Sequence, residues 1–309
     1  MTNPFHDGEV RMHELTGETE EAEANSPMIA ARIAKGIIPF LSQRSLAMLG
    51  VGNRGHLWSI PMIGHLGFVA VPDQTRLVFD LRKLVMPIDP WIIEAANEGG
   101  PAGSLFIDLQ TRMRYRINGT LSHPDPDTIE LRALEAYGNC PKYISKRTIQ
   151  WDTHPSDNVA QLSGERLTSQ QSTTLHDTDL FFIATGHPER GLDVSHRGGN
   201  PGFVTIADDK TIRFPDYPGN SLYNSLGNLL IDNRIGILVP DLRRRRALRI
   251  TGTAAILFQE AIHEVTTTDA PRLVQVTISH WNEIEFPVSS SHFIEYSPFN
   301  PRPASSVAV

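Results

Sequence analysis

The sequence predicts a mostly β fold with minor α content, made of two tandem β-barrels that are related by internal duplication. The first observation is a repeat: LFIDLQTRMRYRING at residues 105–119 is echoed by LVPDLRRRRALRITG at 238–252, which places Arg116 in phase with Arg249. The second is an upstream echo, LGFVAVPDQT at 66–75 against PGFVTIADDKT at 201–211. The two anchors stay in register at a spacing far longer than the about 20–50 residues of a solenoid unit, which indicates duplication of a whole small domain.

The third observation is a series of short runs that are rich in β-branched and aromatic residues and separated by turn residues. In the first half they are SLAML, LWSIPMI, GFVAV, RLVFDL, SLFIDL and RYRING, and in the second DLFFIAT, LDVSH, GFVTI, TIRFP, IGILVP and ALRITG. Such runs are typical of an antiparallel meander that closes into a barrel. One helix is expected to interrupt each series, starting at Asp89-Pro90 in the first half and in the Asn220-Ser221 region in the second.

These elements divide the chain into an N-terminal extension (1–25), a first barrel (26–155), a second barrel (156–297) and a flexible tail (298–309). Ser26-Pro27 is an N-cap and N1 pair, and the isoleucines that then recur every four residues from Ile29 predict a helix leading into the first barrel. Residues 120–165 are expected to connect the barrels. The charged N-terminal extension is expected to be ordered only where it docks.

Composition excludes several classes of protein. The 309 residues are 40% apolar, which is enough for two cores. The chain has 28 Lys and Arg against 35 Asp and Glu, a net charge of −7, which argues against a general nucleic-acid surface. The single Cys140 excludes an internal disulfide, and no stretch approaches the roughly 18 apolar residues of a membrane span. We therefore expect a cytoplasmic protein that binds neither nucleic acid nor membranes.

Two conspicuous motifs favour a structural interpretation. Gly50, Gly52 and Gly55 spell GxGxxG, but HLWSIPMI follows in place of a helix, so a hairpin turn is favoured over a dinucleotide-binding loop. Arg243 to Arg246 lie in a predicted hairpin turn as solvated charges; the alternative is a patch for an anionic substrate or the tail of a nucleotide. No metal-binding, serine-hydrolase or kinase motif occurs, so no metal is expected and the catalytic residues stay unassigned.

A candidate anion site begins in DVSHRGGNPGFV, where Ser195 and Arg197 stand beside Gly198. Arginine supplies a planar fork that matches phosphate oxygens, and glycine lets a ligand approach the backbone. The first half has Pro61 or a neighbouring apolar residue at the position of Arg197, so its copy lacks the anion donor. The structural alternative is an ordinary surface arginine beside a glycine-rich turn.

The helix start that follows completes this candidate site. Asn220, Asn224 and Ser225 surround the first turn of a helix, where unpaired N–H groups and small polar side chains bind anions. The equivalent start in the first half carries Asp89, whose carboxylate would repel a phosphate. The alternative is that one of these residues is only an N-cap.

The segment YGNCPKYISKR leaves the first barrel with two cations, Lys142 and Arg147, beside Cys140. We expect the cations to reach across to a site on the second barrel. The lone cysteine is typical of an inert core residue.

Several of these motifs together resemble the pyridoxamine 5′-phosphate oxidase-like superfamily, the FMN-binding split barrels. FFIATGHPERGLDVSHRGGNPGFV, FPDYPGNSLYNSLGNLL and LRITG resemble its flavin core, and FHDGEVRMHELTG and NCPKYISKR resemble segments of its two-barrel group, over about residues 5–295. The resemblance implies two tandem FMN-binding split β-barrels, with FMN at an interface between barrels and a homodimer as the usual assembly. One departure is Leu222, which stands where many members carry a phosphate-binding lysine. The implied FMN-binding residues are Ser195, Arg197, Gly198, Asp216, Tyr217, Asn220, Asn224, Ser225, Lys142 and Arg147.

Two functions fit this resemblance. The leading hypothesis is an FMN-dependent oxidoreductase that takes electrons from a small-molecule substrate or from a donor such as NAD(P)H, with the cofactor carrying the chemistry. The alternative is a non-enzymatic protein that holds a flavin or another planar ligand for storage, sensing or partner recognition.

Overall fold

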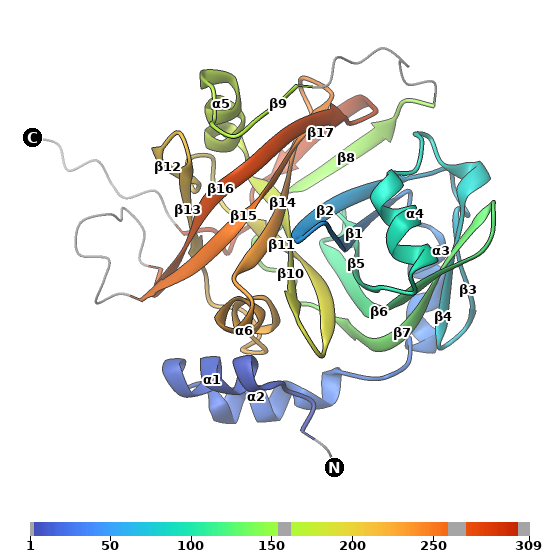
Figure 1. Cartoon of the computed structure of the whole chain (residues 1–309), viewed down its shortest axis with the longest axis horizontal. Helices are drawn as coiled ribbons and strands as arrows, with labels where there is room; N and C mark the ends of the chain where they lie inside the picture. Colours follow the sequence, from blue (N-terminus) through green and yellow to red (C-terminus); the bar gives the residue numbers. More distant parts are fainter. Residues whose placement is uncertain (1–2, 154–161, 259–269, 302–309) are drawn as a thin grey trace, which may run out of the picture.

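The computed structural model describes residues 3–153, 162–258 and 270–301 (Figure 1). The predicted boundary around 154–161 and most of the predicted tail lie outside these residues. The helices are α1 (Asp7–Thr16), α2 (Thr19–Asn25), α3 (Ile38–Ser42), α4 (Pro90–Asn97), α5 (Ser169–Asp177) and α6 (Asn224–Ile231), with 3₁₀ turns η1 (Ser26–Met28), η2 (Lys35–Ile37) and η3 (Leu81–Lys83). None of the helices in these ranges is long and apolar enough to cross a membrane.

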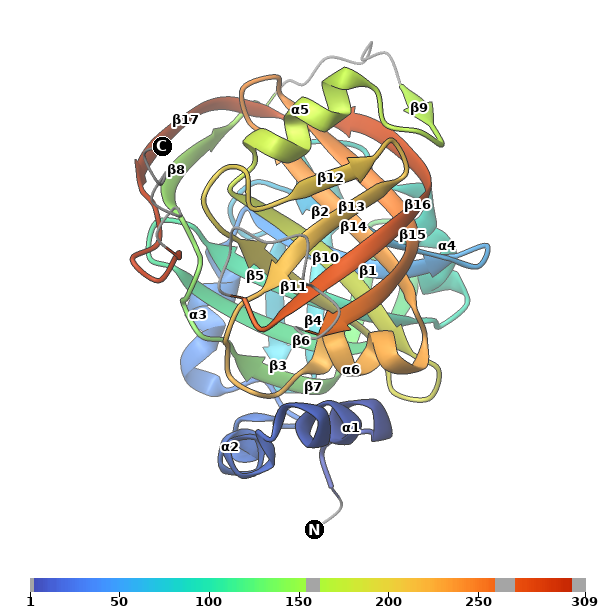
Figure 2. The same ribbon diagram turned by 90° about the vertical axis from the view of Figure 1, so that its left-hand side faces the viewer.

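Two antiparallel sheets with the same strand order form two barrels that lie side by side (Figures 1 and 2). The first follows the order β2-β1-β5-β6-β7-β4-β3, and the second the order β11-β10-β14-β15-β16-β13-β12, with β9 paired to β16. The mostly β fold with two tandem split barrels is therefore confirmed. The strands of the first sheet are β1 (Leu46–Asn53), β2 (His56–Ile63), β3 (Val69–Asp73), β4 (Arg76–Asp80), β5 (Pro101–Asp108), β6 (Met113–Asp125) and β7 (Thr128–Gly138). Those of the second are β9 (Ser163–Gly164), β10 (Leu180–His187), β11 (Gly191–Gly198), β12 (Thr205–Asp208), β13 (Thr211–Asp216), β14 (Arg234–Asp241), β15 (Arg246–Phe258) and β16 (Arg272–Glu285), while β8 (Lys146–Trp151) pairs with β17 (Val288–Glu295).

Each barrel has its own apolar core, and a third core joins the two. Phe79 and Phe106 stack inside the first barrel, and Phe181 packs edge-on against Phe214 inside the second. Between the barrels, Met48 of β1 and Phe182 of β10 belong to one buried cluster. Burying apolar side chains in this way supplies the main favourable contribution to folding.

Glycines let the barrels touch through their backbones. A Cβ atom on Gly103 of β5 would lie 2.6 Å from the carbonyl carbon of Asp193 in β11, and one on Gly236 of β14 would lie 2.5 Å from the carbonyl oxygen of Leu57 in β2. Both distances are far below van der Waals contact. The two glycines occupy equivalent strands of the two sheets, so the barrels pack through a matched pair of close contacts.

Three expectations about local structure need correction. The helix predicted from Ser26 does not form, because Ala30 pairs with Ala136 of β7 as an isolated bridge. Of the three isoleucines from Ile29 to Ile37, Ile33 is the one that is fully buried, as a member of the first core. Residues 120–165 are not a plain connection, since β7 within them completes the first sheet. The second crossover helix begins at Asn224, later than the predicted region, while α4 begins at Pro90 with Asp89 as N-cap as predicted.

Both motifs given a structural interpretation do form turns. Gly50 and Gly52 lie in β1, and Gly55, with φ of 81°, closes the turn to β2. The arginine run Arg243–Arg246 begins in the turn between β14 and β15.

Candidate functional site

A cavity of about 110 Å³ lies between the two barrels, beside the start of α6. The first barrel contributes Arg114 and Arg116 of β6 and the segment that follows β7, and the second contributes β11, the end of β13 and the loop that leads into α6. Four cationic side chains and a single carboxylate line it, namely Arg114, Arg116, Lys142, Arg197 and Asp216.

Arg116 is the central cation at the inner end of this cavity. Its Nε donates to the carbonyl of Val194 at 2.9 Å, Nη1 donates to the hydroxyl of Tyr137 at 2.7 Å, and Nη2 donates to the Ser195 hydroxyl. The Ser195 hydroxyl in turn lies 2.7 Å from that of Ser225, at the start of α6. A guanidinium from the first barrel therefore meets the polar side chains that the second barrel offers.

The first turn of α6 lies open to the cavity. Its N-cap Tyr223 has a left-handed backbone, with φ of 56°, and no side chain caps the helix. Asn224, Ser225 and Leu226 all line the cavity. The first N–H groups of a helix have no partner within the helix, so this end favours an anion.

Asp193 lies under these groups. It is buried, and it accepts from the Ser225 hydroxyl at 3.2 Å and from the Asn228 amide at 2.5 Å. Its carboxylate is 3.9 Å from Arg116. Burial raises the pKa of Asp193 above its ordinary value, although the charge of Arg116 opposes this shift.

The other side of the cavity carries a cluster of two arginines and one aspartate. Arg197 donates to Asp216 Oδ1 at 2.9 Å, and Arg272 donates twice to Oδ2, at 3.1 and 3.0 Å. The cluster keeps a net positive charge because one carboxylate faces two guanidinium groups. The Nε of Arg197 is buried without a partner.

Arg114 is the cavity arginine for which no carboxylate partner is found among the described residues. Its Nε donates to the carbonyl of Cys140 at 2.8 Å. Burial, reinforced by the positive charge of Arg116, lowers the pKa of Arg114 to about 9, which leaves it charged at neutral pH. Such a cation attracts an anionic ligand.

The structure brings nine of the ten predicted site residues to this cavity: Ser195, Arg197, Gly198, Asp216, Tyr217, Asn220, Asn224, Ser225 and Lys142. It does not bring Arg147 there. Arg147 lies in β8, forms an ion pair with Asp179, and lines a different cavity beside α5. Gly198 is required for another reason than the one expected, because a Cβ atom there would overlap the carbonyl oxygen of Tyr143.

Arg114 and Arg116 are the site residues that the sequence reasoning missed. The signal was the in-phase repeat of Arg116 and Arg249, which indicates a common role for the two positions. Leu222, where the resemblance in sequence led to the expectation of a lysine, is fully buried in a cluster with Phe5 and Tyr137. A lysine at 222 would be buried among these side chains instead of facing the cavity.

The equivalent place in the first barrel is filled by side chains. Arg249 enters it from the second barrel, forms an ion pair with Asp89 at the start of α4, and lies over the rings of Trp58 and Trp91. The two tryptophans are stacked with centroids 4.4 Å apart. Strand pairing places Met62 where the second barrel has Arg197, in agreement with the expected apolar residue.

Comparison with known proteins gives fold neighbours only. No protein-family model matches the sequence, and no curated protein matches it. Similar solved structures include a protein related to general stress protein 26, of the pyridoxinephosphate oxidase family, from Clostridium acetobutylicum, with 14% identity, 40% of this chain and 92% of that chain covered, and a TM-score of 0.31. An FMN-binding protein from Syntrophomonas wolfei has 10% identity, 38% and 85% coverage, and a TM-score of 0.28. The FAD-binding protein from Mycobacterium smegmatis has 17% identity, 40% and 98% coverage, and a TM-score of 0.28.

Proposed function

We propose that the cavity between the barrels binds flavin mononucleotide, one molecule per chain. The observation that carries the proposal is charge: four cations and one carboxylate line a cavity in a chain whose net charge is −7. Excess positive charge in a partly buried site attracts an anion such as a phosphate. The resemblance of the surrounding motifs to flavin-binding split barrels supports a flavin as the molecule that carries this phosphate.

The donors at the inner end fit a phosphate group. Arg116 offers a guanidinium, and the uncapped start of α6 offers N–H groups. The hydroxyls of Ser195 and Ser225, which bond each other and Asp193, would turn towards the phosphate when it binds. Arg114 adds a charge that no described carboxylate neutralises. These residues would hold the phosphate of the cofactor.

The aromatic residues would hold the flavin ring. Tyr143 and Tyr217 are both partly exposed, and their ring centroids are 5.0 Å apart. The cavity is smaller than the roughly 300–1,000 Å³ of ordinary ligand pockets, so we expect these two side chains to move outward when the ring binds. Lys142 and Arg197 would contact the ring or its polar edge from opposite barrels.

We further propose that the bound flavin takes part in electron transfer. A flavin when bound supplies hydride and electron chemistry itself, so the protein needs to supply only binding, orientation and charge. The one histidine among the residues that line the cavity, His196, is buried against Phe182, and burial lowers its pKa well below the ordinary value. It therefore stays neutral, which agrees with a site where the flavin and not a protein side chain carries out the chemistry. Reduction of the bound flavin by NADPH or NADH under anaerobic conditions supports an oxidoreductase. A flavin that binds but is reduced by neither nicotinamide supports the non-enzymatic alternative.

The test of binding uses a pair of equivalent arginines. Arg116→Met removes the guanidinium from the cavity, and Arg249→Met removes its counterpart from the filled place in the first barrel. Loss of charge-assisted hydrogen bonds of about 1.5–3 kcal/mol corresponds to a roughly 10- to 150-fold weaker affinity for FMN in the first variant. We expect the second variant to bind FMN as the wild type does. Equal affinities in the two variants, or a colourless protein that gains no flavin absorption on addition of FMN, would contradict the proposal.

The number of sites follows from the two barrels. One chain supplies both walls of the cavity, and the equivalent place in the first barrel is closed by Trp58, Trp91 and Arg249. We therefore propose one FMN per chain whether or not the chain forms a homodimer. Titration of bound flavin against protein concentration, with the mass in solution measured alongside, tests this stoichiometry.

A further inference from the structure

Residues 5–26, here called the N-terminal strap, lie across α6 and the loop before it, which contains Asn220 and Ser221 and lines the cavity. Figure 1 shows α1 and α2 crossing beneath α6. A Cβ atom on Gly227 of α6 would lie 2.6 Å from the backbone nitrogen of Glu9 in α1, so the two helices touch backbone to backbone. The strap therefore contacts α6 directly, backbone against backbone, at Gly227.

Hydrogen bonds from the strap follow the loop along its length. The Asn25 amide donates to the carbonyl of Asn220 at 3.0 Å, and the Ser221 hydroxyl donates to Glu18 at 2.7 Å. Ser221 has a left-handed backbone with φ of 59°, a conformation that is costly for a residue with a side chain and persists only when its surroundings hold it. The strap provides such surroundings.

Glu9 connects the strap to the cavity through Asn224. The Asn224 amide nitrogen donates to Glu9 Oε1 at 2.5 Å, and this bond fixes the direction of the amide. The amide oxygen of Asn224 then accepts from Nη1 of Arg116 at 3.2 Å. Glu9 is thus a positioning residue, because it acts on Arg116, which would donate hydrogen bonds to the phosphate, only through Asn224.

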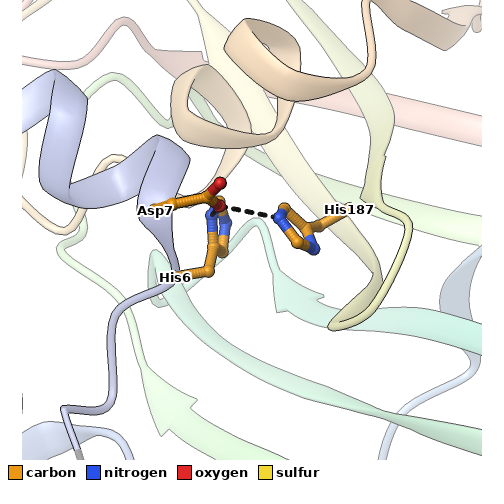
Figure 3. A group of neighbouring side chains, drawn as sticks. All are labelled: His6, Asp7 and His187. Carbon is orange, nitrogen blue, oxygen red and sulfur yellow. Dashed lines mark hydrogen bonds and ion pairs between the residues drawn. The ribbon is translucent and has the colours of Figure 1, made fainter.

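A clasp at the start of α1 holds Glu9 in place. His6 caps the helix, and its backbone N–H donates to Glu9 Oε2 at 2.9 Å. His187, from the hairpin of β10 and β11, lies 2.9 Å from the carboxylate of Asp7, and its ring is 4.4 Å from that of His6 (Figure 3). His6 Nδ1 accepts from the backbone N–H of Gly8, so the His6 side chain also holds the first turn of α1 in place.

We propose that the N-terminal strap makes the cavity selective for a ligand that ends in a single phosphate group. Around Asn224 the strap places the carboxyl group of Glu9, and Phe5 of the strap forms an apolar cluster with Leu222 of the loop before α6. These groups offer a second phosphate neither space nor positive charge. A mononucleotide therefore fits and a dinucleotide such as FAD does not. This inference rests on the proposed flavin binding.

The experiment compares affinities for FMN, FAD and riboflavin by quenching of flavin fluorescence. We expect the wild type to bind FMN at least tenfold more tightly than either of the others. Glu9→Ala opens space beside Asn224 and removes the hydrogen bond that holds its amide. We therefore expect the ratio of the affinities for FMN and FAD to fall at least fivefold. Glu20→Ala, on the exposed side of α2, is the matched control and keeps the wild-type preference. Where Glu9→Ala fails to fold, Asp7→Ala removes the clasp without changing a cavity residue and narrows the preference in the same direction.

The outcomes separate the two proposals. Equal affinity of the wild type for FMN and FAD overturns the role of the strap and leaves flavin binding intact. A folded Glu9→Ala variant that keeps the wild-type ratio of affinities for FMN and FAD also overturns the role of the strap and leaves flavin binding intact. A wild type that binds none of the three flavins overturns both.

Discussion

Gly227→Ala tests the crossing of α1 and α6, on which the strap depends. Glycine within a helix costs about 0.8–1.0 kcal/mol relative to alanine, so the exchange alone would stabilise α6. The new Cβ atom, however, would lie 2.6 Å from the nitrogen and 2.8 Å from the Cα of Glu9, where ordinary contacts begin at 3.4 Å. The third close atom is Cγ of the Glu9 side chain, at 2.7 Å, but the other two belong to the backbone, so rotation of a side chain cannot relieve the overlap. Overpacking of this kind costs about 1–3 kcal/mol.

Because the steric cost outweighs the gain in helix propensity, we expect Gly227→Ala to weaken the packing of α1 on α6 by a net amount of up to about 2 kcal/mol. Hydrogen exchange of residues 7–16 measures this docking, and denaturant unfolding measures the stability of the whole chain. Gly36→Ala is the control, since its Cβ atom meets nothing within 4 Å. If α1 in Gly227→Ala is protected as well as in the wild type, the helices do not cross at the distance described and the reasoning fails.

Three further predictions concern other parts of the structure. Arg197→Ala should weaken FMN binding by about 1.5–3 kcal/mol, measured as a dissociation constant, and an unchanged constant would remove Arg197 from the site. Burial raises the pKa of Glu9 from 4.5 to about 8, so folding takes up a proton between these two values. The contribution of Glu9 to stability is therefore full below pH 4.5 and is lost, by at most about 5 kcal/mol, as the pH rises to 8. Denaturant unfolding of Glu9→Gln should lack this slope, and a wild type equally stable at pH 5 and 8 would disprove it. Gly103→Ala should lower the melting temperature far more than Gly36→Ala, because its Cβ atom meets the backbone of Asp193.

Strands were predictable where the sequence alternates β-rich runs with turn residues. TIELRALEAYG was missed as β7 because LRALEA is rich in helix formers, while the strand is fixed by pairing with β4 and β6. The isoleucines from Ile29 to Ile37 imitate a helical period, yet Ile29 packs with Phe5 and Ile33 lies in the first core. In both places tertiary pairing decided the backbone conformation against the local signal.

The candidate site divides in the same way. Residues of the second barrel follow one another in β11 and in the loop before α6, so local motifs were enough to place them. Arg114 and Arg116 reach the cavity only because the barrels dock, and Arg147 stays away because β8 pairs with β17. Docking depends on backbone contacts at Gly103 and Gly236, which no periodic pattern in the sequence reveals.

The same two contacts bear on how quickly a bound cofactor could leave. At these two glycines the strands touch through their backbones and no side chain lies between them to rearrange, while the third apolar core holds the rest of the interface, so the barrels have little freedom to part as rigid bodies. Release would then be governed by the outer side of the cavity, where Tyr143 and Tyr217 meet, and the lifetime of the complex would reflect the opening of this aromatic pair. Substitution of either tyrosine would change the dissociation rate, whereas the barrels themselves would behave as a fixed frame.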